Sequence, residues 1–394
     1  MKKVAKRYWI FAFMMLISLV FSCPVSASDG AENVDIDTEA QAVEGELEQF
    51  RGSVPAEVAD LLPEGFFSAD VTEMGDAVVE ASAPRAVFSV IGRMTGLAVG
   101  EYLSALAKIC GLLLIGAVFR MLAKGRESGK ALEGGLSFCG TCALAVGIFS
   151  MQRAVFRDLS AYFEGLQTLA ASFLPLMGGL YAMGGNVGAA VVNHGVMSAF
   201  LAILETVVSG SVLPVAGICL VLALSDALSG GGRLRSLAGL IKRSYTLFFS
   251  FLMLILCGVL GIQTTLAKGS DTLALRTVRF AAGSFLPVVG GSVSEALRTV
   301  SGSVQYLRTV VGMGGVVVVL FFFLPFFLNV MLGRITFLLS GAAAKLLGCD
   351  GEEKLLSELA SVYGYFMAVI ASLFVMTVFS LTLFARCATA GGSV

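Results

Sequence analysis

Long uncharged runs, separated by short charged ones, dominate the chain beyond Arg93 and constrain its fold more than any other feature. Backbone groups in hydrocarbon have no water to bond, so runs of ~20 apolar residues cross a bilayer as helices. Apolar residues make up 57% of the 394 positions and charged residues only 14%, about half the charged share of a soluble domain. We therefore predict an all-α, polytopic membrane protein. Seven runs reach or nearly reach the required length: Tyr102 to Phe119, Gly134 to Gln152, Val187 to Leu204, Thr206 to Ser225, Ser244 to Ala267, Thr309 to Gly333 and Leu359 to Ala385.

The N-terminus has the pattern of an export signal followed by an acidic arm. Basic residues precede the apolar stretch Trp9 to Phe21, and Val25 and Ala27 offer a cleavage site, so residues 1–27 are predicted to be a signal peptide. A lipoprotein cleaved at Cys23 and an uncleaved anchor are the alternatives. Residues 28–92 are acidic and poor in aromatics, which predicts a partly disordered extracytoplasmic arm. The arm serves either as a spacer or as a docking segment for a partner.

An internal repeat divides the remainder of the chain. Ser172 to Gly179, SFLPLMGG, recurs as Ser284 to Gly291, SFLPVVGG, with six identities in eight positions. We expect a helix pair over residues 93–168, a first membrane repeat over 169–282 and a second over 283–394. Proline and glycine interrupt helices, so each copy is interpreted as a re-entrant segment, and residues 293–308 as an amphipathic helix on the membrane surface. The expected helix breaks are Pro175, Gly178, Gly179, Pro287, Gly290 and Gly291.

Charge distribution suggests an orientation for seven spans. With a cleaved signal, the arm lies outside, and the loop from Arg120 to Lys130 lies in the cytoplasm, as the positive-inside rule requires. The acidic stretch Asp350 to Glu358 is then external, and the two repeats are inverted relative to each other. The basic loop Arg233 to Arg243 is also external in this scheme, against the rule. If the first repeat element spans, this loop moves inside and the count rises to eight or nine.

Few residues point to chemistry. Asn193 and His194 lie in an apolar run, and Glu205 falls eleven positions later on nearly the same helical face. These polar groups either line a conduit or make structural contacts between helices. No motif for catalysis, nucleotides or metal binding occurs, so we expect no enzyme activity, no cofactor and no metal site. The acidic N-terminal part disfavours nucleic acid as a partner.

The order of signal, acidic arm, helix pair and duplicated F-[IL]-P-x-x-G-G element resembles the stage III sporulation protein AE family of endospore-forming bacteria. The segment Phe285 to Gly315, FLPVVGGSVSEALRTVSGSVQYLRTVVGMGG, carries the match. The resemblance implies a subunit of the channel-like complex that joins mother cell and forespore and is needed for late forespore development. It also implies a place in the mother-cell membrane around the forespore, with other membrane proteins of that complex as partners.

Three functions remain open from the sequence. The leading hypothesis is a permease-like subunit of the transenvelope complex, embedded in the lipid bilayer. A stand-alone secondary transporter for a small solute is the alternative, since inverted repeats with broken helices are common in transporters. A scaffold that recruits partners without conducting is the third. A homo-oligomer is compatible with all three.

Overall fold

The computed structural model describes residues 37–68, 70–124, 129–183, 195, 198, 202, 208–229, 234, 236–255, 258 and 290–387. The chain divides into two units, Met1–Asp37 and Thr38–Val394, and the second contains the packed helices. No strand occurs among the described residues, which confirms the predicted all-α class. The elements are α2 (Asp37–Ser53), α3 (Ala56–Ala59), α4 (Val71–Ser82), α5 (Pro84–Lys124), α6 (Gly129–Met183), η1 (Val208–Val212), α8 (Leu213–Ser229), α10 (Gly290–Leu346) and α11 (Asp350–Cys387).

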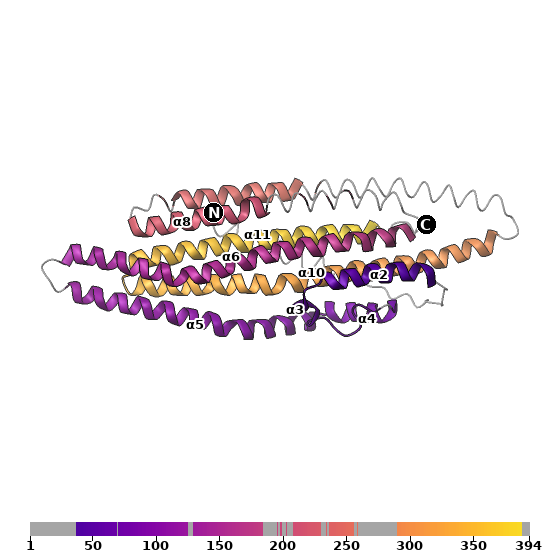
Figure 1. Ribbon diagram of the computed structural model, residues 1–394, viewed down its shortest axis with the longest axis horizontal. Coiled ribbons are helices and arrows are strands. Elements are labelled where there is room, and N and C mark those ends of the chain that lie inside the picture. Colours follow the sequence, from indigo (N-terminus) through magenta and orange to yellow (C-terminus); the bar gives the residue numbers. More distant parts are fainter. Residues whose placement is uncertain are drawn as a thin grey trace. The chain divides into compact units, whose positions relative to one another are not determined.

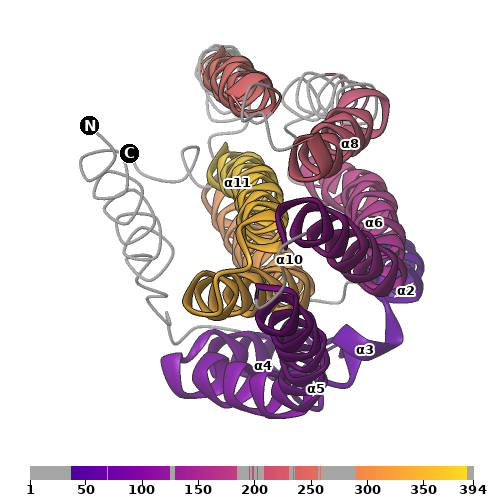
Figure 2. The same cartoon turned by 90° about the vertical axis from the view of Figure 1, so that its left-hand side faces the viewer.

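The antiparallel pair of α10 and α11 forms the centre of the packing (Figure 1). Gly348 has φ +67°, and the amide of Cys349 donates to the carbonyl of Ala344 at 2.9 Å. This is a Schellman turn, in which a glycine without a Cβ lets α10 end sharply. Phe323 stacks on Phe374 with 4.1 Å between ring centroids. α5 and α6 pack on α10, and α8 packs on α11 (Figure 2).

Six helices are long and apolar enough to cross a membrane, counted over the described residues. They are Pro84–Leu122, Gly134–Leu180, Gly210–Leu228, Ser236–Ile255, Thr309–Leu346 and Asp350–Thr382. Five of the seven predicted spans coincide wholly or largely with these helices, and a sixth, Ser244 to Ala267, coincides over residues 244–255, while most of its remainder lies outside the described residues. The seventh, Val187 to Leu204, falls almost entirely outside the described residues, as does the predicted signal peptide.

Three short helices, α2 to α4, lie within the predicted acidic arm. Phe50 of α2 packs edge-on against Phe173 of α6, with ring centroids 5.6 Å apart. Val78 of α4 is 2% exposed and lies against Gly314 of α10. Each short helix places its apolar side chains on one face, so the arm gains enough buried surface to order on the long helices. The predicted boundary at residue 92 falls inside α5.

The first repeat element is a continuous helix, so the prediction of a break at Pro175, Gly178 and Gly179 is wrong. α6 continues through Pro175 to Met183, and the predicted domain boundary at residue 168 lies within it. Leu176, Met177 and Leu180 are each 0% exposed. Burial of several such side chains at ~1.5–3 kcal/mol each outweighs the ~3 kcal/mol that an interior proline costs a helix.

The second repeat element begins a helix. Gly290 and Gly291 form the first residues of α10, while Pro287 lies outside the described residues. Residues 293–308, which we expected to form a separate surface helix, are the first turns of the same 57-residue helix. The duplication itself stays a prediction.

Candidate functional site: two buried ion pairs

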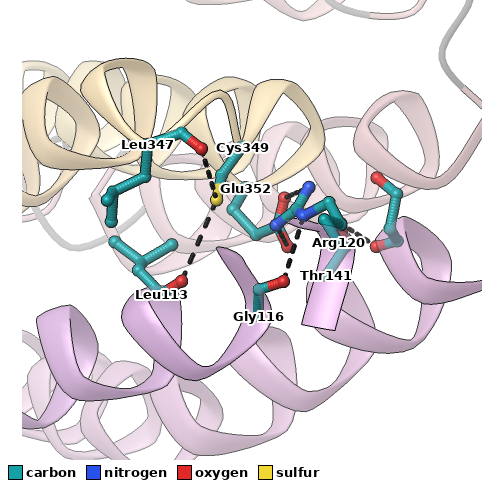
Figure 3. A network of polar contacts seen from close by, with 8 residues as sticks. Leu113, Gly116, Arg120, Thr141, Leu347, Cys349 and Glu352 are labelled. Atoms are coloured by element: carbon teal, nitrogen blue, oxygen red, sulfur yellow. Dashed lines mark hydrogen bonds and ion pairs between the residues drawn. The ribbon is translucent and has the colours of Figure 1, made fainter. Parts of the chain in front are cut away.

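Arg120, near the end of α5, forms a bidentate ion pair with Glu352 in the first turn of α11 (Figure 3). The Nη2 atom donates to Oε1 at 2.7 Å and the Nη1 atom donates to Oε2 at 3.2 Å. The two side chains are 8% and 3% exposed. Paired, planar geometry of this kind is the strong form of an ion pair, since both carboxylate oxygens receive a charge-assisted hydrogen bond.

The local sequence makes room for this pair. A Cβ at Gly140 of α6 would lie only 2.6 Å from Oε1 of Glu352, so the glycine allows α6 to approach the carboxylate. The Nε atom of Arg120 donates to the carbonyl of Gly116 at 3.4 Å, which orients the guanidinium along its own helix. Because Glu352 lies in the first turn of α11, the helix dipole also favours its negative charge.

Cys349 lies beside this pair in the turn between α10 and α11. Its thiol is 0% exposed and is within 3.9 Å of the carbonyl of Leu113 and 3.8 Å of the carbonyl of Leu347. Burial raises the pKa of the Cys349 thiol above its ordinary value, and the Arg120 guanidinium opposes that rise only in part. The thiol therefore stays protonated and serves as a small packing group.

A second buried ion pair joins Lys242, in the Ser236–Ile255 helix, to Glu358 of α11. The Nζ atom is 2.8 Å from Oε2 of Glu358 and donates to the hydroxyl of Ser361 at 2.7 Å. The two charged side chains are 7% and 9% exposed. Nearby, the buried Asp226 at the end of α8 accepts a hydrogen bond from the amide of Leu234 at 3.1 Å.

Both carboxylates come from α11, while the cations come from two other helices. The first pair therefore connects α5 to α11, and the second pair connects the Ser236–Ile255 helix to α11. We call the end of the bundle marked by Arg120, Lys242, Glu352 and Glu358 the charged end. Among the described residues, no group of three His, Cys, Asp or Glu side chains could hold a metal ion. Each carboxylate is engaged by a cation, which suits a structural link better than proton transfer.

A smaller polar contact lies deeper in the bundle. The hydroxyl of Tyr102 on α5 donates to Oδ1 of Asn329 on α10 at 2.5 Å. Both residues line a recess that also involves Asp158 and Leu159 of α6. Its volume is about 10 Å³, which is the room for about one water molecule.

The first ion pair corrects the predicted orientation. The seven-span scheme placed Arg120 in the cytoplasm and Glu352 outside, but the two side chains touch and so lie at the same end. Ala227, at the end of α8, also reaches this end, since its carbonyl lies 3.7 Å from the position of a Cβ on Gly351. The C-terminal ends of α5 and α8 and the start of α11 therefore meet here. Lys242 in the Ser236–Ile255 helix pairs with Glu358 and so lies toward the same end as Arg120, which removes the conflict with the positive-inside rule.

The residues predicted to form a site are not the ones that the structure brings together. Asn193, His194 and Glu205 lie outside the described residues, and their role stays a prediction. Sequence reasoning missed the four charges of the ion pairs. The available signal was Glu352 and Glu358 at the start of an apolar run, together with Arg120 and Lys242 near the ends of two other runs.

Comparison with known proteins identifies the chain's relatives. The model of the stage III sporulation protein AE family matches residues 72–388. A protein of Bacillus subtilis (strain 168) named stage III sporulation protein AE is 25% identical over 160 residues, which cover 40% of this chain and 40% of that protein. No solved structure matches the chain. The family match spans most of the sequence, including all four charges of the ion pairs, and so the chain belongs to the stage III sporulation protein AE family.

Proposed function

We propose that this protein is a membrane-embedded, permease-like subunit of the sporulation complex that links mother cell and forespore. The main support for the proposal is the family match over residues 72–388, because the family is one of stage III sporulation proteins. The six long apolar helices support a place in the membrane. The protein acts without catalytic chemistry of its own.

The proposed location is the mother-cell membrane around the forespore, with α2 to α4 in the space between the two membranes. The partners are other membrane proteins of the same complex, and additional copies of this chain can take part. The ordered arm supports this reading, because its exposed faces carry carboxylates that suit an aqueous space. Its buried faces are anchored on α6 and α10.

Deletion of the gene in its host tests the sporulation role. We expect few heat-resistant spores and weak late forespore gene expression, with both restored by a second copy of the wild-type gene. A copy carrying Arg157→Ala, an exposed position on α6, serves as a matched control and should also restore them. Normal spore yield in the deletion strain would remove the proposal.

Transport by the isolated protein is the alternative, and scaffolding is the third reading. Purified protein in vesicles that moves a small solute down an ion gradient, with no other subunit present, would favour a stand-alone transporter. A scaffold predicts that polar substitutions at Asn193 and His194 leave sporulation intact, while deletion of residues 37–82 abolishes assembly. A permease-like subunit predicts that both changes lower spore yield.

A further inference from the structure

Most of the exposed large apolar side chains among the described residues lie in one part of the bundle. All but four of those described lie within Leu103–Leu122 of α5, Phe138–Phe149 of α6, α8, the Ser236–Ile255 helix and Ile335–Leu346 of α10. The four exceptions are scattered singly: Val79, Phe88, Val99 and Tyr306. We call the group within the five segments the lipid belt. Such a large exposed apolar surface requires an apolar partner, because water contact with it is unfavourable.

Charged side chains border the lipid belt. Glu101 on α5 and Arg153 on α6 are exposed at its outer edge. From Glu101 to Arg120, and from Gly134 to Arg153, the helices rise about 29 Å, close to the ~30 Å of bilayer hydrocarbon. Lys108 and Arg243 are exposed within the belt, and their long side chains can reach the nearest border.

Beyond this outer border, α6 continues with a polar surface. α6 runs on for a further 30 residues, about 45 Å, to Met183. Its exposed positions there are small or polar: Arg157, Ala161, Glu164, Thr168 and Ala171. They recur every three to four residues, so one face of the helix is compatible with water.

The most apolar segment of the chain lies in this polar-surfaced part, enclosed by protein. Val317 to Phe323 of α10 are mostly less than 8% exposed. Phe322 touches α6 at Gly165, and Phe323 stacks on Phe374 of α11. Nearer the start of α10, α4 covers Gly314 and exposes Glu73, Asp76 and Glu80 on its other face. Because these carboxylates are exposed beside the start of α10, hydrocarbon does not surround this part of the bundle.

We propose that bilayer lipid covers only the lipid belt, and that the rest of the bundle stands in water as a rigid stalk outside the cytoplasm. The stalk consists of α2 to α4, Pro84–Gly100 of α5, residues 154–183 of α6 and the parts of α10 and α11 packed on them (Figure 1). The inference rests on the membrane-embedded role proposed above. It adds how much of the bundle lies in the bilayer and on which side of the membrane the stalk stands.

The charged end sets the direction of the stalk. In the sequence, the segments that join these helices, together with the adjoining helix ends, hold nine Lys and Arg residues besides the Arg243 of the belt: Arg120, Lys124, Arg126, Lys130, Arg233, Arg235, Lys242, Lys345 and Lys354. Basic residues in short loops stay in the cytoplasm. The arm, packed at the opposite part of the same helices, is therefore extracytoplasmic.

Cysteine labelling in protoplasts tests the proposal. The full chain is produced in vegetative cells, where no other sporulation protein covers it, and a membrane-impermeant maleimide is added before or after permeabilisation. The test variants on α6 are Ala161→Cys and Ala171→Cys in the stalk and Val146→Cys in the belt. Lys345→Cys, exposed at the charged end, reports the cytoplasm. Leu166→Cys, 1% exposed in the stalk, is the buried control, and the unsubstituted chain sets the background of native cysteines.

We expect the two stalk variants to label in intact protoplasts roughly tenfold faster than Val146→Cys, because maleimide needs a hydrated thiolate. Lys345→Cys should label only after permeabilisation, and Leu166→Cys only after denaturation. Equal rates at Ala161 and Val146 would overturn the stalk, and labelling of Lys345→Cys in intact protoplasts would overturn its direction. Normal sporulation without the gene would refute the function proposed above and leave these labelling results untouched.

Discussion

Removal of one partner from the Arg120–Glu352 pair should destabilise the protein more than any exposed charge removal. Arg120→Ala deletes two charge-assisted hydrogen bonds of 2.7 and 3.2 Å, each worth about 1.5–3 kcal/mol. It also leaves the carboxylate of Glu352, 3% exposed, without a cation. Together these effects predict a loss of about 3–5 kcal/mol in the free energy of unfolding. We would measure it by titrating the purified protein from mild detergent into SDS and following helix content.

Two further variants make this prediction specific. Arg157→Ala removes a charge whose contact with Asp158 is 3.6 Å long and whose side chain is 83% exposed, so it should cost at most about 1 kcal/mol. The double variant Arg120→Met with Glu352→Leu removes both buried charges and should recover most of the stability lost in Arg120→Ala. If Arg120→Ala costs no more than Arg157→Ala, the pair is solvated and our account of the charged end is refuted.

Three other predictions concern packing, lipid contact and pH. In the same titration, Gly165→Ala should lower the free energy of unfolding by about 1–3 kcal/mol, because its Cβ would lie 2.6 Å from Cζ of the buried Phe322. Gly178→Ala, whose Cβ would have nothing within 4 Å, should be neutral or stabilising. Equal effects of the two substitutions would contradict the packing. Val146→Asp should lower membrane insertion by about 2.5–3.5 kcal/mol, while Thr168→Asp on the same helix should not, as judged from the membrane-bound fraction of each. Because the pKa of Cys349 is raised, its contribution to stability is present below the ordinary thiol pKa of 9.0 and is lost as the pH rises above that value. Cys349→Ala should therefore flatten the fall in the free energy of unfolding between pH 8 and 10. An unchanged slope would contradict this prediction.

Hydrophobic runs predicted the helices well, because in hydrocarbon the backbone has no alternative to helical hydrogen bonds. They could not predict what surrounds each helix. The run from Thr309 to Gly333 is as apolar as any in the chain, yet its first half is covered by α4, α6 and α11. A helix that is apolar on all sides fits a protein core as well as a bilayer. Only the exposed charges on the covering helices distinguish the two.

Long-range contacts explain the two clearest errors. Pro175 was predicted to break the helix because an interior proline is unfavourable in an isolated helix. The burial that offsets this unfavourable free energy comes from helices remote in sequence. The ion pairs were missed for the same reason: Arg120 and Glu352 are 232 residues apart, and Lys242 and Glu358 are 116 apart. Nothing in a single sequence assigns one charge to another at such separations.

The order in which the ribosome makes these partners has a consequence for biogenesis. Arg120 is complete and inserted long before Glu352 leaves the ribosome, and Lys242 likewise precedes Glu358. Until α11 arrives, neither cation has the carboxylate with which it pairs in the folded protein. Entry of α11 supplies both carboxylates at once, so this helix locks the earlier ones in place.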